Sequence, residues 1–122
     1  MFAQNFALSH IRDLYAKLME GIKNDDFELL DLMHHFTAGM KATYTQVCMD
    51  GLITIRQSLG GAGYSAWSGI PRMIDDYSPL VTFEGDNTVM AQQSFNFILK
   101  QARKLKKGKI TEPAFPYILE LD

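Results

Sequence analysis

One carboxylate in this sequence lies where a side chain can be held still for chemistry. Glu84 follows the apolar residues 80–83 and precedes Gly85, just before the expected start of a helix. Gly85 lets the backbone approach a ligand closely, and free N–H groups at a helix start can receive an anionic or polarised oxygen. Glu84 is therefore the first candidate for a functional group. The alternative is that Glu84 only complements the helix dipole.

A second unusual segment is the glycine-rich run GGAGY at residues 60–64. It follows an expected helix, whereas the glycines of a dinucleotide-binding fingerprint follow a strand and open a helix. The sequence also lacks the GK[ST] of a phosphate-binding P-loop. Taken alone, the run favours a helix C-cap and turn over a nucleotide site.

The other chemically active side chains favour structural roles. His34 and His35 are adjacent, and adjacent helical residues point about 100° apart, which disfavours a shared metal site. Cys48 is the only cysteine, so an internal disulfide is excluded. A basic run near the end of the last expected helix could contact RNA or membrane, but cations are also favoured there by the helix dipole. That run comprises Lys100, Arg103, Lys104, Lys106, Lys107 and Lys109.

Apolar residues recur at helical spacing in three stretches, which predicts three main helices. The stripes are Ala3, Ala7, Ile11, Leu14, Leu18 and Ile22; Leu29, Met33, Phe36, Met40, Tyr44 and Val47, continuing to Leu52 and Ile55; and Ala91, Phe95, Ile98, Ala102 and Leu105. We expect the second helix to start near Asp26, with Asp25 and Glu28 as a capping box, and to end at the glycine run.

Local signals predict the remaining elements. Pro71 opens a short helix that should end near Tyr77, and residues 80–83 should then be extended. Asp86 or Asn87 should cap the last helix, which Gly108 closes. Residues 109–122 have no helical period and predict an extended tail along the surface or into a partner. Trp67 and the methionines are expected in the core.

Length and composition indicate one small domain or fragment over residues 1–122, which the apolar periodicity predicts to be helical. Apolar residues form 47% of the chain and charged residues 21%, an ordinary globular balance. The net charge of −2 selects no anionic partner, so nucleic acid is not expected. No apolar stretch approaches the roughly 18 residues of a membrane span, so no membrane insertion is expected. An unpaired thiol fits a reducing compartment.

Several separated motifs carry a family resemblance. The stretches HHFTAGMKA, RQSLGGAGYSAWSGIP, TFEGDNTVMAQQ and FILK resemble the acyl-CoA oxidase family in order and spacing. FEGDNTV is closer to oxidases than to the related dehydrogenases, which typically carry EGT. The resemblance implies an all-α fold, with three main helices and a short one forming part of the family's C-terminal helical bundle.

By this resemblance, Glu84 is the general base that removes the α-proton of an acyl-CoA thioester. The β-hydrogen leaves as hydride to FAD, and oxygen reoxidises the flavin to give hydrogen peroxide. Gly85 would border the substrate. A carboxylate gains basicity in an apolar, water-excluded pocket, and the backbone N–H of the same glutamate would help to polarise the thioester carbonyl. The implied setting is fatty acid β-oxidation in the peroxisome.

The resemblance also implies two regions of contact with FAD. One lies against the FAD of a neighbouring subunit and comprises Gln57, Gly60, Gly61 and Gly63. The other approaches the adenosine end of FAD and comprises Asp86, Asn87 and Thr88. No metal ligand is implied.

Two hypotheses about function remain open, because the family's flavin-cradling β-domain and its other helical domains do not occur within these residues. The chain is either a segment of a catalytic acyl-CoA oxidase or a truncated, non-catalytic relative that acts as a structural subunit of a larger complex. In both cases the isolated chain is expected to be inactive and to need the remaining domains, a second subunit or a larger assembly. The terminal ILELD lacks an SKL-type peroxisomal signal, so a mitochondrial or other compartment is the alternative location.

Overall fold

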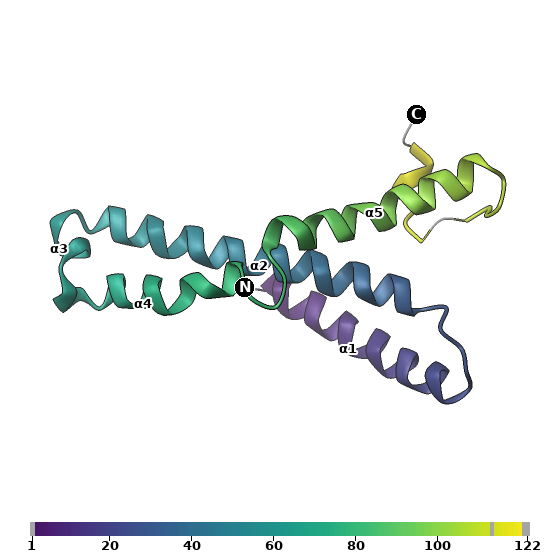
Figure 1. Ribbon diagram of the computed structural model, residues 1–122, viewed down its shortest axis with the longest axis horizontal. Helices are drawn as coiled ribbons and strands as arrows, with labels where there is room; N and C mark the ends of the chain where they lie inside the picture. The colour runs from purple at the N-terminus through teal and green to yellow at the C-terminus, as the bar shows by residue number, and fades with distance from the viewer. Residues whose placement is uncertain (1, 113, 121–122) are drawn as a thin grey trace. The chain divides into compact units, whose positions relative to one another are not determined.

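Every element in the described part of the chain is helical. The computed structural model describes residues 2–112 and 114–120 (Figure 1). The α-helices are α1 (Phe2–Lys23), α2 (Leu30–Ser58), α3 (Gly61–Tyr64), α4 (Ile70–Tyr77) and α5 (Asn87–Lys106). Three short 3-10 helices are η1 (Ala66–Ser68), η2 (Ser78–Val81) and η3 (Pro116–Glu120). The predicted all-α fold is confirmed.

Two compact units divide the chain. The terminal unit comprises residues 1–38 and 93–122, and the central unit comprises residues 39–92. Helices α2 and α5 contribute residues to both units, whereas α1 belongs to the terminal unit and α3 and α4 to the central unit.

The turn between α1 and α2 corrects the predicted start of the second helix. Asp25 has a positive φ of 56°, and the amides of Asp25 and Asp26 donate to the carbonyls of Ile22 and Gly21 at 3.2 and 3.0 Å. This paired pattern is a Schellman motif, so Asp25 ends α1 and does not cap α2. The Oδ1 atom of Asp26 accepts from the Glu28 amide at 2.9 Å within a turn. Helix α2 consequently begins at Leu30, four residues later than expected.

The same motif ends α5, as predicted. Gly108 has a φ of 65°, and the amides of Gly108 and Lys109 donate to the carbonyls of Leu105 and Lys104 at 2.9 and 3.0 Å. Glycine adopts this backbone conformation without a Cβ clash. The two helix ends therefore differ mainly in the residue that takes the left-handed position.

The terminal unit has a small apolar core built from three helices and the residues after α5. Its buried side chains include Leu14 and Leu18 of α1, Ala38 of α2, Phe97 of α5 and Ile118 of η3. The ring of the buried His35 stacks on Phe97 with centroids 4.9 Å apart and lies 5.2 Å from the ring of Phe115. The Nδ1 atom of His35 lies 2.9 Å from both the carbonyl oxygen and the hydroxyl of Ser94.

The expected surface tail is corrected for residues 115–118. Ile118 is only 2% exposed, and it lies within η3, so this part of the tail is neither extended nor confined to the surface. Burial of one isoleucine contributes about 1.5–3 kcal/mol relative to exposure, which favours docking of the segment. Residues 113, 121 and 122 of the expected tail and the side chain of Ala3 lie outside the described residues.

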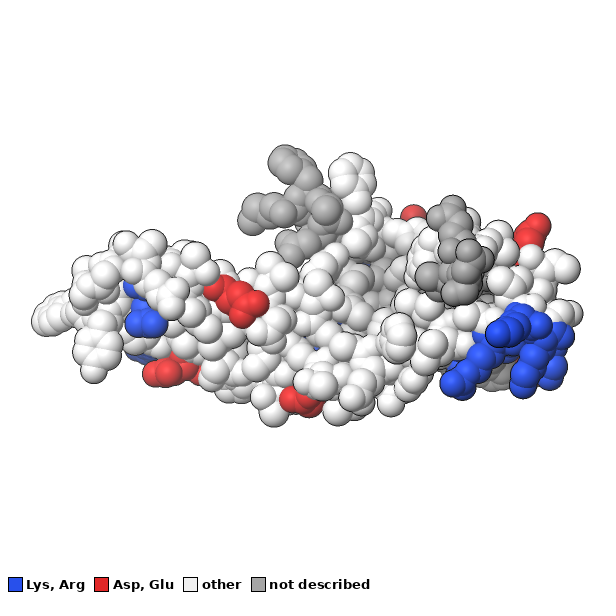
Figure 2. All heavy atoms as spheres, turned by 90° about the horizontal axis from the view of Figure 1, so that it is seen from above, with Lys and Arg blue, Asp and Glu red and all other residues white. Residues whose placement is uncertain are grey.

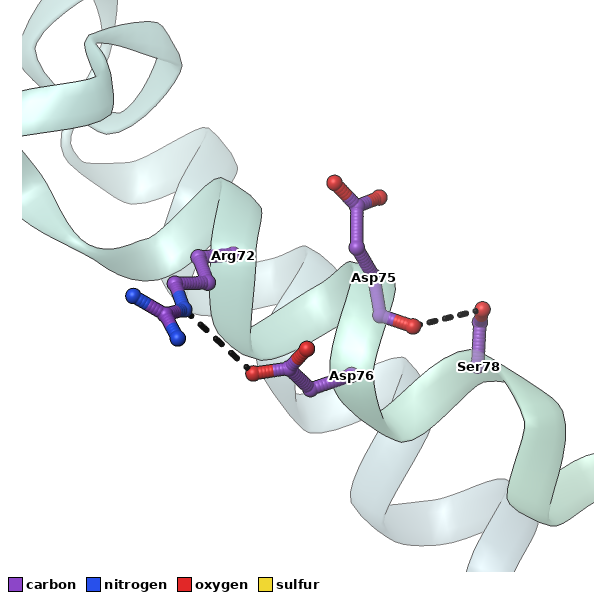
Figure 3. Close-up of polar contacts among 4 residues, drawn as sticks. All are labelled: Arg72, Asp75, Asp76 and Ser78. Carbon is purple, nitrogen blue, oxygen red and sulfur yellow. Dashed lines mark hydrogen bonds and ion pairs between the residues drawn. The ribbon is translucent and has the colours of Figure 1, made fainter.

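In the central unit, α4 runs beside the second part of α2 (Figure 1). A hydrogen bond with Cys48 of α2, followed by burial and the charge of the thiolate, raises the pKa of Tyr77 to about 12. Helix α4 begins at Ile70 with Pro71 in its first turn, and it ends at Tyr77, as predicted. On its solvent side Arg72 pairs with Asp76 at 3.6 Å, and the Ser78 hydroxyl donates to the Asp75 carbonyl at 3.1 Å (Figure 3). Both members of the ion pair are largely exposed, so the pair stabilises α4 little.

Several apolar residues predicted to be buried are exposed. Val47, Ile55 and Phe95 of the predicted stripes are 57%, 49% and 57% exposed, and Trp67 of η1 is 99% exposed. The placement of Trp67 in the core is therefore wrong for this chain. A notable residue that the stripes missed is Phe97, which is buried in the terminal unit.

The two Schellman motifs give a matched pair of substitutions. We expect Asp25→Gly to raise the free energy of unfolding by about 0.5–1 kcal/mol, because it relieves the positive φ and removes an anion from a helix C-terminus. Gly108→Ala should lower it by about 1 kcal/mol, because alanine would have to adopt a φ of 65°. Urea denaturation of the chain and its two variants measures both changes. Equal effects of the two substitutions would contradict this account of the helix ends.

Candidate active site

The loop that carries Glu84 is a tight turn. Residues 78–81 form η2, and the amides of Thr82 and Phe83 both donate to the carbonyl of Pro79 at 2.9 Å. The prediction that residues 80–83 are extended is therefore wrong, because Pro79 opens a helical turn in which local hydrogen bonds replace an extended backbone. The chain then reverses into α5 through Glu84, Gly85 and Asp86.

Glu84 occupies an unusual backbone conformation. Its φ is 55°, in the left-handed region where a non-glycine residue costs on the order of 1–3 kcal/mol and persists only when its surroundings enforce it. The side chain is exposed, so the residues of this chain do not by themselves enclose the carboxylate. Among the described residues, no backbone carbonyl accepts a hydrogen bond from the Glu84 amide.

Gly85 adopts a backbone conformation that favours glycine. Its φ is 107°, and a Cβ added there would lie 2.7 Å from Cε of Met90, the end of a flexible side chain. The positive φ alone disfavours any other residue at this position.

Asp86 caps α5, as predicted. Its Oδ1 atom accepts from the amides of Thr88 and Val89 at 2.9 and 3.4 Å, and its carbonyl accepts from the Met90 amide at 2.8 Å. These bonds satisfy donors that the first turn of a helix otherwise leaves without partners. The carboxylate of Asp86 is thereby committed to the helix start.

Asn87 is held by a hydrogen-bond network from α2 that the sequence analysis missed. The ammonium of Lys41 donates to Oδ1 of Asn87 at 2.8 Å and also to the carbonyl of Gly85. The hydroxyl of Thr45 donates to the same Oδ1 at 3.0 Å, and Nδ2 of Asn87 donates to Oε1 of Gln46 at 3.3 Å. Lys41 and Thr45 are four residues apart and share one helix face, so two polar residues within an apolar stretch were the available signal.

Asn87 and Thr88 also line an open groove of about 480 Å³ in the central unit. The groove is bounded on the α2 side by Ala42, Thr43, Gln46 and Val47 and on the α5 side by Asn87, Thr88 and Ala91. Most of the surface that lines the groove is apolar, and Asn87, Thr88 and Gln46 contribute polar atoms to it. Two of the three residues expected near the adenosine end of a flavin are therefore neighbours here.

The glycine run lies apart from Glu84 within the central unit. Helix α3 is at one end of the pair formed by α2 and α4, and the loop before α5 is at the other (Figure 1). The predicted cofactor residues consequently form two separate groups. Gln57, Gly60 and Gly61 are exposed, and a Cβ at Gly60 or Gly61 would meet no atom within 4 Å.

Close packing against the end of α2 leaves no room for a side chain at Gly63. It is buried, and an added Cβ would lie 2.2 Å from the carbonyl oxygen of Arg56. Because a backbone atom cannot rotate away, any larger residue must move α3 from the end of α2. The structural explanation for the glycine run, a turn after a long helix, therefore holds at Gly63.

The other candidate groups are the paired histidines and the basic run, of which His34, Lys100 and Arg103 line a hollow of about 260 Å³ in the terminal unit. Lys and Arg side chains gather over the C-terminal end of α5 (Figure 2), where Arg103, Lys104, Lys106, Lys107 and Lys109 are exposed. Within residues 2–112 and 114–120, no group of three His, Cys, Asp or Glu residues could hold a metal ion. The described helices include none that is long and apolar enough to cross a membrane.

Comparison with known proteins identifies the family. Residues 1–99 match the family of the acyl-CoA oxidase C-alpha1 domain. This chain belongs to the acyl-CoA oxidase family. The family resemblance inferred from the motifs is thus confirmed.

Relatives of this chain include peroxisomal acyl-coenzyme A oxidase 1 of Cavia porcellus, which is 36% identical over 98% of this chain and 18% of the relative. The protein of the same name from Homo sapiens is 33% identical over the same shares. The chain therefore spans about 18% of the length of these curated relatives.

Two solved structures share the fold of this chain. Arabidopsis thaliana acyl-CoA oxidase 1 superposes with a TM-score of 0.85 at 33% identity, over 98% of this chain and 18% of that one. Caenorhabditis elegans acyl-CoA oxidase-1, solved in complex with FAD and ATP, gives 0.79 at 28% identity, over 93% and 17% of the two chains.

The glycine run offers a test of packing against cofactor contact. We expect Gly63→Ala to lower the free energy of unfolding by about 1–3 kcal/mol, because the new Cβ meets the backbone of α2. Gly61→Ala is the matched control and should be neutral or stabilise by up to about 1 kcal/mol, since its Cβ points into open space. Thermal denaturation of both variants measures the difference. A Gly63→Ala variant as stable as Gly61→Ala would refute the packing account.

Proposed function

We propose that this chain provides the α-proton-abstracting base, Glu84, of an FAD-dependent acyl-CoA oxidase that acts in fatty acid β-oxidation. The observation that carries the proposal is the backbone of Glu84, which is held at a positive φ beside a capped helix start in a member of this family. Strained backbone persists where its surroundings enforce it, and such residues cluster at functional sites.

The proposed chemistry explains the residue type. The α-proton of an acyl-CoA thioester is weakly acidic, so its removal requires a fixed base within reach and stabilisation of the charge that develops on the thioester oxygen. The Glu84 carboxylate would take the proton, and the Glu84 amide would donate to the thioester oxygen. Gly85 would border the substrate. A bound FAD would accept the β-hydrogen as hydride and pass the electrons to oxygen.

The residues of this chain fit two partial contacts with FAD. Asn87 and Thr88 line the groove at the start of α5, where a polar cofactor edge can meet hydroxyl and amide groups. Around the exposed Gly60 and Gly61 there is open space, so a ligand can approach the backbone closely. Gln57 is exposed at the end of α2. We propose that these groups contact two different FAD molecules, one of them held by a second subunit.

The peroxisome is the proposed location, because the curated relatives are peroxisomal enzymes. The other domains of an acyl-CoA oxidase and a second subunit are the proposed partners. Exposed Trp67 and Tyr64, at 99% and 80%, are consistent with surfaces that a larger assembly covers.

The second candidate function is a non-catalytic structural subunit, which the exposure of the Glu84 side chain favours.

Substitution of the base tests the proposed function in the full-length enzyme that contains this chain. We expect Glu84→Gln to slow anaerobic flavin reduction by acyl-CoA by roughly 10²–10⁴-fold, because glutamine keeps the shape of the side chain but accepts no proton. Affinity for acyl-CoA should persist. The measurement is bleaching of the visible flavin absorbance after rapid mixing.

Asp86→Asn is the control. Asparagine also caps helices well, so the chemical step should change far less than in Glu84→Gln. An unchanged rate of flavin reduction in Glu84→Gln would show that Glu84 is not the base. If the chain binds no flavin by itself or with any partner, the structural-subunit function is the correct one.

A further inference from the structure

We infer that Lys41 is a positioning residue, which fixes the loop that carries Glu84 by bonding to oxygens on both sides of Asp86. The inference rests on the proposed role of Glu84 as the base. Lys41 lies in α2, more than forty positions earlier in the sequence, and neither its residue type nor its spacing marked it as functional.

Lys41 holds two points of the loop at once. Its ammonium donates to the carbonyl of Gly85, the residue next to Glu84, and at 2.8 Å to Oδ1 of Asn87, the first residue of α5. The hydroxyl of Thr45, one turn further along α2, lies 3.0 Å from the same Oδ1 and 2.8 Å from the Lys41 carbonyl, so its one proton is shared between these two acceptors. The loop is thus tied to a long helix by contacts on one helix face.

The loop needs such a restraint. Glu84 and Gly85 have successive positive φ values of 55° and 107°, and the glycine has access to many other conformations. Asp86 fixes the helix side of the turn through the Thr88 and Val89 amides, but those bonds lie beyond Gly85. The Lys41 contact with the Gly85 carbonyl is what restrains the peptide between Gly85 and Asp86, and through it the direction of the Glu84 side chain.

The charge of Lys41 supports this assignment. Hydrogen bonds from a charged donor are stronger than those between neutral groups, and a residue in a strained backbone region persists only when its surroundings enforce it. Lys41 is half-buried, and the ion pairs found among the described residues join Arg72 with Asp76 and Lys100 with Asp31. The hydrogen bonds of the Lys41 ammonium to the loop therefore go to neutral oxygens, those of Gly85 and Asn87.

Lys41→Met in the full-length enzyme tests the inference. Methionine keeps most of the length of the side chain but cannot donate, so Glu84 should lose its fixed direction. Misplacement of a catalytic group by about 1 Å can cost roughly 10²-fold. We expect anaerobic flavin reduction by acyl-CoA, measured per bound flavin, to slow by about 10–100-fold, with acyl-CoA affinity unchanged. Lys41→Arg should restore part of the rate, because arginine can still donate to both oxygens.

Matched variants make the result decisive. Lys100→Met makes the same change at an exposed lysine of the terminal unit and should leave the rate unchanged. Thr45→Val removes one bond to Asn87 and should slow reduction less than Lys41→Met, which provides a second reading if Lys41→Met folds poorly. An unchanged rate per bound flavin, a loss of acyl-CoA affinity in proportion to the rate, or no rescue by Lys41→Arg would overturn the positioning role.

Glu84→Gln measured alongside separates the two proposals. If Glu84→Gln slows reduction and Lys41→Met does not, the positioning role is wrong and the base assignment stands. If Glu84→Gln leaves reduction unchanged, the base assignment fails, and the positioning role of Lys41 fails with it.

Discussion

The bond from the Lys41 ammonium to the Gly85 carbonyl is the constraint on which the candidate site depends. It joins a helix of 29 residues to a turn with successive positive φ values. Each residue within a helix is held by hydrogen bonds to its neighbours. The bond from Lys41 therefore restrains the backbone of Gly85 against α2. The capping carboxylate of Asp86 then extends the order into α5. Without the bond from α2, the glycine beside Glu84 would leave the turn free to adopt other conformations.

Helix positions were predictable because they follow from local signals. Periodic apolar residues located α1, α2 and α5, and Pro71 located α4. The Asp86 cap and the end of α5 at Gly108 were also read correctly. Asp25 was misassigned, because aspartate is favoured both at a helix N-cap and at a left-handed position, and only the hydrogen bonds distinguish the two. Residues 80–83 look extended by composition, yet residues 80 and 81 belong to the 3-10 helix that contains Pro79, and residues 82 and 83 form a turn.

The parts of the site that escaped prediction depend on contacts between distant positions. Lys41 and Asn87 meet only because α2 and the start of α5 come together, and no local pattern in the sequence encodes that meeting. The positive φ of Glu84 was likewise not predictable from the sequence, because glutamate seldom adopts this conformation. Burial was misjudged for a different reason. Apolar spacing marks the faces that a protein covers, and Val47, Ile55 and Trp67 are exposed in a chain spanning about 18% of its relatives.

The direction of the Glu84 side chain and its exclusion from water have separate origins. The central unit supplies the direction of Glu84 through residues of its own, namely the α2 anchor, the paired positive φ values and the α5 cap. It does not supply enclosure, because the carboxylate remains exposed. General-base catalysis needs both a fixed base and exclusion of water, since water competes for the carboxylate and screens the charges that stabilise the transition state. For the proposed base, enclosure would therefore come from surfaces outside this chain, so the same fixed Glu84 would be a base in a closed assembly and a solvated loop residue without one.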